Sequence, residues 1–262
     1  MDMRFSEWFL ETANSLLTVV VSLFLLTVGA YSVYALWDNE RIYSAVEDIQ
    51  ADMAKHKPDV MTTDEGTEPA GTVFDALNAI NSDICAWVTL DNTNIDFPVV
   101  QGENNLSYIN MDIYGNFSLA GSIFLDVRNA ADFTDGCSIL YGHHMEESGM
   151  FGDLDLYKEE RFFHENRTGT LILPDRVYDL DIFACLVVSA SDAMIFDSDR
   201  MDSDRNAYFE YCEQNAIHLH EDVLEREKSA QDVQILEMTT CSSEFTDART
   251  IVLAVMRPQK AQ

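Results

Sequence analysis

The feature that most constrains this chain is a run of 26 residues, 12–37, that contains no Asp, Glu, Lys, Arg or His. As a helix with about 1.5 Å of rise per residue, it spans about 39 Å, which exceeds the ~30 Å hydrocarbon core of a bilayer. Aromatic residues typical of a membrane interface lie near the two ends of the run: Trp8, Phe9, Tyr31, Tyr34 and Trp37. The pattern predicts a single N-terminal transmembrane helix.

A cleaved signal peptide is the competing interpretation of this run, because residues 33–35 (Val-Tyr-Ala) offer a passable cleavage site. The apolar stretch is too long for the hydrophobic region of a signal peptide, however, and Arg4 is the only basic residue before it. Three basic residues, Arg41, Lys55 and Lys57, follow within 20 residues. This excess of basic residues after the run would place the rest of the chain on the cytoplasmic side of the membrane, but four charges are too few to decide the orientation.

Net charge excludes one class of partner. The 262 residues carry 46 acidic against 16 basic side chains, a formal charge of −30, while 47% of them are hydrophobic. Such a chain has enough apolar residues to build a core, so it is not a disordered acidic tail. It also lacks the clustered Lys and Arg that hold phosphate backbones, which argues against nucleic acid as a partner.

Four regions follow from the pattern along the chain. Residues 1–11 form a short terminus and 12–37 the membrane span. In 38–71, helical spacing of apolar residues predicts an amphipathic helix over 40–56, ended by Lys57-Pro58 and followed by a linker. We expect the globular domain at 72–262, opening on a short helix that Thr72 caps.

Short apolar or alternating runs separated by turns dominate this domain, which predicts a mainly β barrel or sandwich. Eight candidate strands are CAWVTL, NIDFPVVQ, SIFLD, CSILYGH, GTLILP, VYDLDIFACLVVS, DVQILEMTT and RTIVLAVM. Residues 174–176 predict a hairpin. In the longest run we expect every second residue from Tyr178 to Val188 to share one buried face. A helix over about 205–215 interrupts the late strands, with Tyr208, Phe209 and Cys212 on its apolar side.

The five cysteines show neither a disulfide framework nor zinc-ligand spacing. Cys85, Cys137 and Cys185 lie in apolar strands and Cys212 on the helix, where a free thiol acts as a small hydrophobe. Cys241 differs because it ends a strand before a polar loop, which places it at a rim. Eight residues later Arg249 opens the returning strand, so we expect both at the same end of a β pair, where a guanidinium can stabilise an oxyanion.

A thiol nucleophile also needs a proton acceptor, and two of the six histidines are candidates. His143 and His144 follow the apolar run CSILYG at a strand end, which is again a rim position. The other four, His56, His164, His218 and His220, lie in polar contexts, and we expect them to be solvated. Cys, His and Arg at strand ends are consistent with acyl transfer, although a rim histidine is more often merely solvated.

Two stretches, TTCSSEFTDAR at 239–249 and LYGHHM at 140–145, resemble the signature regions of sortases, the membrane-anchored cysteine transpeptidases of mainly Gram-positive surfaces. They resemble class B in particular, which shows T-L-S-T-C with an Arg eight residues on, and Y-G-H-N-M. NIDFPVVQGENNLSYIN, GSIFLDVRN and MFGDLDLY agree with it too, over about residues 74–257. The resemblance implies an eight-stranded sortase-type β-barrel with N-terminal helices and an inserted helix before the cysteine strand.

The resemblance also implies roles for individual residues. Cys241 matches the nucleophile, His143 the general acid/base and Arg249 the oxyanion-stabilising arginine, while His144 stands where the class has Asn and could partly substitute for His143. Substrate-groove positions are matched by Thr239 and Thr240 beside the cysteine and by Asn105 and Ile109. For Asn105 and Ile109, loop capping and core packing are equally good interpretations. Glu237 and Met238 also depart from the family pattern, which leaves substrate preference open.

The reaction implied is cofactor-free acyl transfer. A sorting motif near the C-terminus of an exported protein is cleaved through a thioester, and an amine of a cell-wall precursor or of a pilin lysine resolves it. The family likeness implies a cell-membrane protein with a cytoplasmic N-terminus and an extracellular domain. A hydrolytic cysteine protease and a catalytically silent, membrane-tethered binding module are the alternatives. A calcium ion is an optional cofactor, and its ligands would be four acidic residues: Asp197, Asp199, Asp202 and Asp204.

Overall fold

A computed structural model gives the structure of the chain and describes residues 2–58, 70–145, 149–230 and 232–259. The chain divides into two compact units, Met1–Ala45 and Val46–Gln262. Helix α1 (Asp2–Met53) continues into a 3-10 turn, η1 (Ala54–His56), and ends before Lys57-Pro58, as predicted. The sequence predicts separate membrane-spanning and amphipathic helices, whereas the structure has one. No proline interrupts these residues, so nothing forces a break.

Within α1, the 18-residue stretch that is most apolar has a mean hydropathy of 2.2, and the helix is long enough to cross a membrane. The large apolar side chains between Trp8 and Trp37 are exposed. The linker predicted after α1 falls mostly on residues 59–69, outside the described part of the chain. Helix α2 (Ala70–Ile80) then begins two residues before Thr72, the predicted cap.

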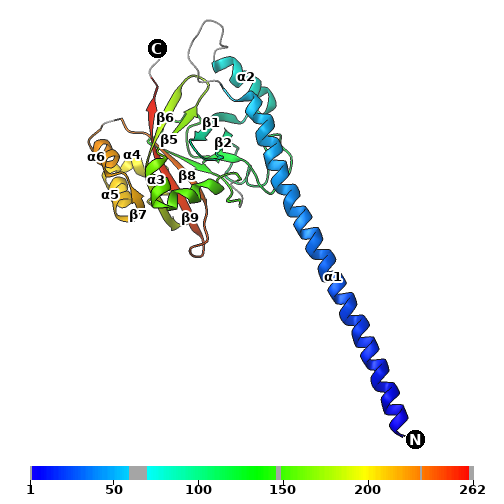
Figure 1. Ribbon diagram of the computed structural model, residues 1–262. Coiled ribbons are helices and arrows are strands. Elements are labelled where there is room, and N and C mark those ends of the chain that lie inside the picture. The colour runs from blue at the N-terminus through cyan, green and yellow to red at the C-terminus, as the bar shows by residue number, and fades with distance from the viewer. Residues whose placement is uncertain (1, 59–69, 146–148, 231, 260–262) are drawn as a thin grey trace. The chain divides into compact units, whose positions relative to one another are not determined.

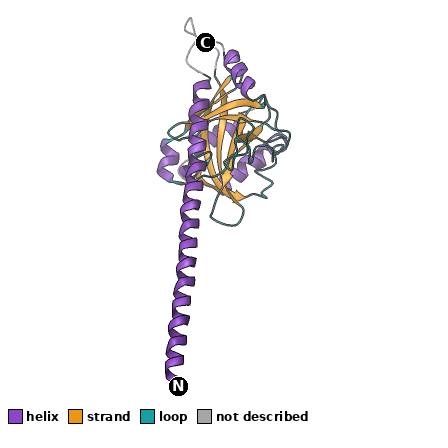
Figure 2. Ribbon diagram, turned by 90° about the vertical axis from the view of Figure 1, so that its right-hand side faces the viewer, coloured by secondary structure: helices purple, strands orange, loops and turns teal. Residues whose placement is uncertain are grey.

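Among the described residues, nine strands form one sheet in the order β5-β1-β2-β3-β4-β8-β9-β6-β7. An additional β5–β6 pairing closes the first eight of these into a barrel (Figures 1 and 2). The eight-stranded barrel predicted from the resemblance is therefore confirmed. The strands are β1 (Ile84–Leu90), β2 (Asp96–Val100), β3 (Ile123–Leu125), β4 (Cys137–Tyr141), β5 (Thr168–Ile172), β6 (Val177–Ser189), β7 (Ala216–Leu219), β8 (Ile235–Cys241) and β9 (Ala248–Pro258).

The helices of the domain include η3 (Gly152–Lys158), α3 (Glu160–Glu165), α4 (Arg200–Ser203), α5 (Arg205–Asn215) and α6 (Glu221–Ser229). Helix α5 has the predicted bounds, and its predicted apolar residues are buried. Asp204 caps it by accepting a hydrogen bond from the backbone N–H of Ala207 at 3.1 Å. Helices α4, α5 and α6 lie together on one side of the barrel, next to the unpredicted strand β7 (Figure 1).

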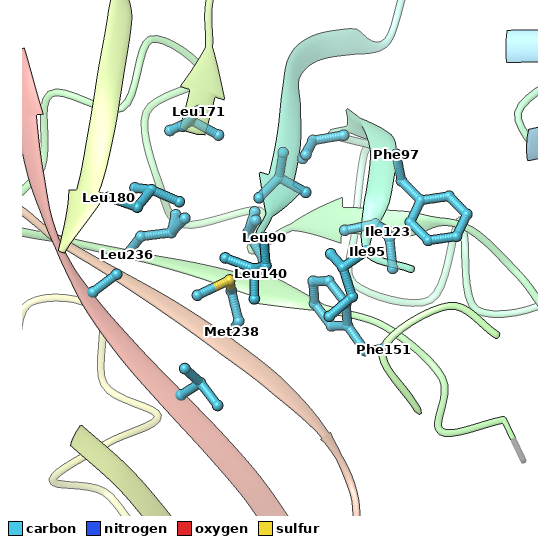
Figure 3. Close-up of a cluster of buried hydrophobic side chains, with 14 of the residues drawn as sticks. Leu90, Ile95, Phe97, Ile123, Leu140, Phe151, Leu171, Leu180, Leu236 and Met238 are labelled. Carbon is cyan, nitrogen blue, oxygen red and sulfur yellow. The ribbon is translucent and has the colours of Figure 1, made fainter. Parts of the chain in front are cut away.

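Apolar side chains fill the inside of the barrel. Leu171, Leu180, Leu236, Leu140 and Met238, which come from β5, β6, β8 and β4, point toward one another there (Figure 3). A second cluster lies between the outer faces of β8 and β9 and the helices α5 and α6. Because residues alternate between these two clusters, β8 and β9 are buried on both faces over most of their length.

Strand β6 corrects the prediction that its alternate residues share one face. The pairing register between β6 and β9 shifts between Ile182 and Ala184, which is a β-bulge. Leu180 and Ile182 pack inside the barrel, but Leu186 and Val188 pack in the outer cluster. One extra residue in a strand with a period of two exchanges the faces, so the local pattern could not show the switch.

Of the four histidines predicted to be solvated, His164 is exposed and His56 and His218 are half-buried, but His220 is buried. His220 is 6% exposed and stacks on Phe163, with ring centroids 4.4 Å apart. His164 and His218 contact the same phenylalanine ring. Nε2 of His218 also donates to the carbonyl oxygen of Lys158 at 2.7 Å, which ties β7 to the end of η3. The polar sequence around these residues conceals their packing against one aromatic ring.

Glu237 in the middle of β8 is fully buried, and neither of its carboxyl oxygens has a hydrogen-bond partner among the described residues. Burial raises the pKa of this carboxyl well above its usual range, mainly because the anion would lose its hydration. In the unfolded chain it ionises near pH 4. The folded state therefore loses stability relative to the unfolded chain as the pH rises above that value.

We predict that Glu237→Gln, which cannot ionise, stabilises the chain by about 1–3 kcal/mol at pH 8 and changes little at pH 4. Thermal unfolding of the detergent-solubilised full chain, followed by circular dichroism at both pH values, measures the difference. Glu210→Gln, at an exposed position of α5, is the control and should change stability at neither pH. Equal stability of wild type and Glu237→Gln at pH 8 would contradict the prediction.

Candidate active site

A pocket of about 130 Å³ opens at one end of the barrel and collects the predicted catalytic residues. It is lined by Ile109, Phe124, Tyr141, Gly142, His143, Thr239, Thr240, Cys241 and Arg249. Most of these residues come from the ends of β4, β8 and β9, and the others from β3 and the β2–β3 connection. Parallel pairing of β4 with β8 puts Tyr141 opposite Thr239, so the ends of these two strands meet at the pocket.

Cys241 and Arg249 face each other across the β8–β9 hairpin. They stand opposite each other in the antiparallel register, at the last pair before the turn. Cys241 is exposed and Arg249 is half-buried. The Arg249 Nη1 donates to the carbonyl oxygen of Ala248 at 2.9 Å. A guanidinium has five N–H donors, so this bond leaves others for an oxygen that enters the pocket. The predicted juxtaposition of the two residues is confirmed.

His143 enters the pocket from the loop after β4. Its Nε2 lies 2.7 Å from the carbonyl oxygen of Ile109, and since a carbonyl only accepts, this nitrogen carries the proton. The bond fixes the orientation of the ring. Gly142 permits the close passage of the backbone here, because a Cβ at that position would lie 2.5 Å from Ile123 and 2.7 Å from Phe151.

His144, by contrast, turns to another partner. Its Nε2 lies 3.1 Å from Oδ2 of Asp155 on η3, and it is absent from the described residues that line the pocket. A second acid/base role would require the ring to leave this carboxylate.

Three of the four residues predicted to lie in the substrate groove line the pocket, and one does not. Thr239 and Thr240 line the pocket and are 1% and 2% exposed, and their hydroxyl groups have no hydrogen-bond partner among the described residues. Ile109 also lines the pocket. Asn105 does not, within the described chain: it donates to Asp126 at 3.0 Å and accepts from the Val127 N–H at 2.8 Å. That is the loop-capping role considered from the sequence.

Asp126 supports the pocket and was not singled out by the sequence. Its fully buried carboxylate accepts from Nε and Nη2 of Arg128 at 2.9 and 2.7 Å, and from the Tyr141 hydroxyl at 3.0 Å. Although burial opposes ionisation, these donors lower the pKa of the Asp126 carboxyl. Tyr141 in turn stacks on Phe124, with ring centroids 5.2 Å apart, so the carboxylate orients one wall of the pocket. In the sequence, Asp126 stood out only as part of the FLDVRN stretch, which resembles class B sortases.

The acidic loop proposed as an optional calcium site holds its carboxylates apart. Asp202 accepts from the Gly136 N–H at 3.2 Å, Asp204 caps α5, and Asp197 pairs with Arg200 at 3.5 Å. The described residues contain no group of three or more His, Cys, Asp and Glu side chains placed to hold a metal ion. Calcium binding stays a prediction without geometric support.

The five cysteines differ in access. Cys137, Cys185 and Cys212 are buried, and Cys85, half-buried in β1, donates its thiol proton toward the Val99 carbonyl at 3.5 Å. Burial raises the pKa of the Cys85 and Cys185 thiols to about 12 and raises those of Cys137 and Cys212 as well. Of the five, only Cys241 is exposed.

We predict that iodoacetamide at pH 7.5 adds to Cys241 alone in the folded chain, because alkylation needs an accessible thiolate. Intact-mass spectrometry counts the adducts, and peptide mapping locates them. The Cys241→Ala variant should take none on the same timescale, while urea should expose the remaining thiols in both proteins. A second adduct that forms as fast as the first in the native wild type would contradict the burial of the other four.

A closed barrel that presents Cys, His and Arg at one rim defines a cysteine acyl-transfer enzyme, and known proteins bear this out. The chain is 36% identical to the solved structure of a Streptococcus pyogenes class B sortase involved in pilus biogenesis, over 70% of this chain and 97% of that one, with a TM-score of 0.64. The Clostridium perfringens sortase B structure is 30% identical over 70% and 98% of the two chains, with a TM-score of 0.63.

Among curated proteins, sortase B of Listeria monocytogenes is 28% identical over 231 residues, covering 88% of this chain and 90% of the relative. No family model matches the chain. The likeness to the streptococcal structure spans nearly all of that protein. The chain therefore belongs to the class B sortases, a family of cysteine transpeptidases.

Proposed function

We propose that this sortase cleaves a C-terminal sorting motif of exported proteins and transfers the acyl group to an amine of a cell-wall precursor. The observation that carries the proposal is the pocket that Cys241, His143 and Arg249 line together. In the first half-reaction the Cys241 thiolate attacks the carbonyl carbon of a Thr in the motif. Arg249 donates hydrogen bonds to the resulting oxyanion. The C–N bond breaks, and His143, as the imidazolium that holds the proton given up by the Cys241 thiol, protonates the leaving amine.

The thioester left on Cys241 is resolved in the second half-reaction. An acceptor amine attacks the thioester carbonyl, the C–S bond breaks, and a new amide bond forms. His143 takes the proton that the amine loses, which restores the starting enzyme. Thr239 and Thr240 line the pocket beside Cys241, which supports a role in binding the peptide, although their hydroxyls are buried and have no partner within the described chain.

A membrane anchor fits this chemistry. The spanning length and apolarity of α1 support a single-pass protein of the cell membrane, and the family likeness supports a cytoplasmic N-terminus with the catalytic domain outside. A tether keeps the enzyme at the surface where exported substrates and lipid-linked acceptors meet, which raises their effective concentration.

We predict that Cys241→Ala abolishes both cleavage and transfer, because the thioester forms on the Cys241 sulfur. The assay offers the detergent-solubilised chain a library of short peptides with a central Thr, with and without an amine, and follows the products by mass spectrometry. Cys85→Ala, at a half-buried thiol outside the pocket, is the matched control and should retain activity. Cleavage by Cys241→Ala would remove the assignment of the nucleophile.

The acceptor has a second candidate, the lysine of a pilin. It is favoured by the 36% identity to the streptococcal class B sortase, which is involved in pilus biogenesis. Both chemistries end in an amide and use the same thioester, so the pocket residues alone fit either.

We predict that a wall-type stem peptide outcompetes a lysine-bearing pilin peptide when both are offered at equal concentration. Mass spectrometry of the transferred products gives the ratio. An excess of the lysyl product would instead support pilin polymerisation, and hydrolysis unaffected by either amine would support a simple protease.

A further inference from the structure

The short helix η3 contacts all three chain segments that carry the proposed catalytic residues. Asp155 binds two of them: its Oδ2 lies 3.1 Å from Nε2 of His144, and its Oδ1 accepts from the Thr250 hydroxyl at 2.9 Å. His144 directly follows His143, and Thr250 directly follows Arg249. One carboxylate thus bridges the histidine loop and the start of β9.

Lys158, one helical turn further along η3, contacts the third segment. Its Nζ lies 2.6 Å from Oε1 of Glu244 in the β8–β9 loop, three residues after Cys241, and 3.0 Å from Oδ1 of Asp155. Glu244 also accepts a hydrogen bond from Ser242, the residue next to Cys241. The lysine therefore joins the cysteine loop to the carboxylate that holds the other two segments.

These contacts form a network of linked charges, unlike most surface ion pairs, which stand alone and contribute little. The Lys158 side chain is only 23% exposed, and it lies between two carboxylates. Lys158 and Ser242 together lower the pKa of the Glu244 carboxyl to about 2, which is consistent with an ionised pair. Although partial burial opposes it, the two acids raise the pKa of Lys158.

The helix that carries the network is itself held rigidly. Leu154 and Tyr157, on either side of Asp155, are fully buried in the core of the barrel. The Lys158 carbonyl accepts the bond from His218 described above. A loop held by such a support keeps a more constant position than one held only by its own turn.

From these contacts we propose that Asp155 and Lys158 are positioning residues, which fix His143, Cys241 and Arg249 relative to one another by tying their segments to η3. The inference rests on the proposed function of those three residues. Neither residue touches the substrate in this scheme. Each acts through a neighbour of a catalytic group, so its loss should slow the chemical step while substrate binding in the groove persists.

We predict that Lys158→Met, which keeps the length of the aliphatic stem, lowers kcat for peptide cleavage about tenfold and leaves KM within about twofold, because misplacement of reacting groups affects the chemical step. The substrate is the library peptide that the wild-type full-length chain cleaves fastest. Asp155→Asn should show the same split. Lys158→Arg, which can still reach both carboxylates, should restore most of the rate.

Lys228→Met is the matched control. Lys228 on α6 is 27% exposed and likewise contacts two carboxylates, Glu213 at 2.7 Å and Glu225 at 3.2 Å, but these lie on α5 and α6 and not in the segments that carry the proposed catalytic residues. It should lose as much thermal stability as Lys158→Met and keep the wild-type kcat. An equal fall of kcat in both variants would reduce the role of Lys158 to general stability, and would overturn the proposal.

A double-mutant cycle tests the contact itself. If Lys158 acts through Glu244, the variant with Lys158→Met and Glu244→Gln should be no slower than Lys158→Met alone. Fully additive losses, or a wild-type kcat in Lys158→Met, would overturn the positioning role. Activity lost in Cys241→Ala but kept in Lys158→Met would leave the proposed function standing and remove this inference alone, so the two failures are distinguishable.

Discussion

The pairing of β8 with a parallel neighbour on one side and an antiparallel neighbour on the other is the constraint on which the site depends. Parallel pairing with β4 brings the strand that precedes His143 level with the strand that ends in Cys241. Antiparallel pairing with β9 then returns the chain so that Arg249 stands opposite the cysteine. Backbone hydrogen bonds in both ladders hold these positions. The pocket is thus a property of strand register, and a slip of one residue would turn Cys241 to the other face.

The outer face of β8 carries residues of the buried core at one end and residues of the pocket at the other. Ile235 packs under the helices, Glu237 is buried with no partner among the described residues, Thr239 lines the pocket and Cys241 is exposed. These alternate residues run from core to solvent within one strand. The buried carboxyl of Glu237 costs folding free energy, and the well-packed inner face of β8, with Leu236 and Met238, offsets that cost. A strand buried on both faces can hold such a group without losing its register.

The sequence alone was enough to predict those parts of the structure that depend on a local pattern of residues. Apolar runs bounded by turn residues indicated the eight barrel strands, and strand ends indicated Cys241, His143 and Arg249 as neighbours. Contacts between distant segments were beyond such reasoning. The bulge at Ile182–Ala184 depends on the register with β9, and strand β7 is only four residues long, too short to show a clear alternation. Asp155 and Lys158 resemble ordinary surface charge in the sequence, because the partners that define their role lie 11 to 95 residues away along the chain. The buried ring stacking of His220 was hidden for the same reason.

The place of β9 in the sequence also determines when the pocket can be completed during synthesis. Strand β9, which supplies Arg249 and pairs with both β8 and β6, follows every other described strand along the chain. Chains are made from the N-terminus, so the histidine loop and the cysteine strand exist before the strand that completes the pocket. A nascent chain that lacks β9 therefore also lacks Arg249 and the pairing partner of Cys241. The pocket is complete only when this last strand has been added.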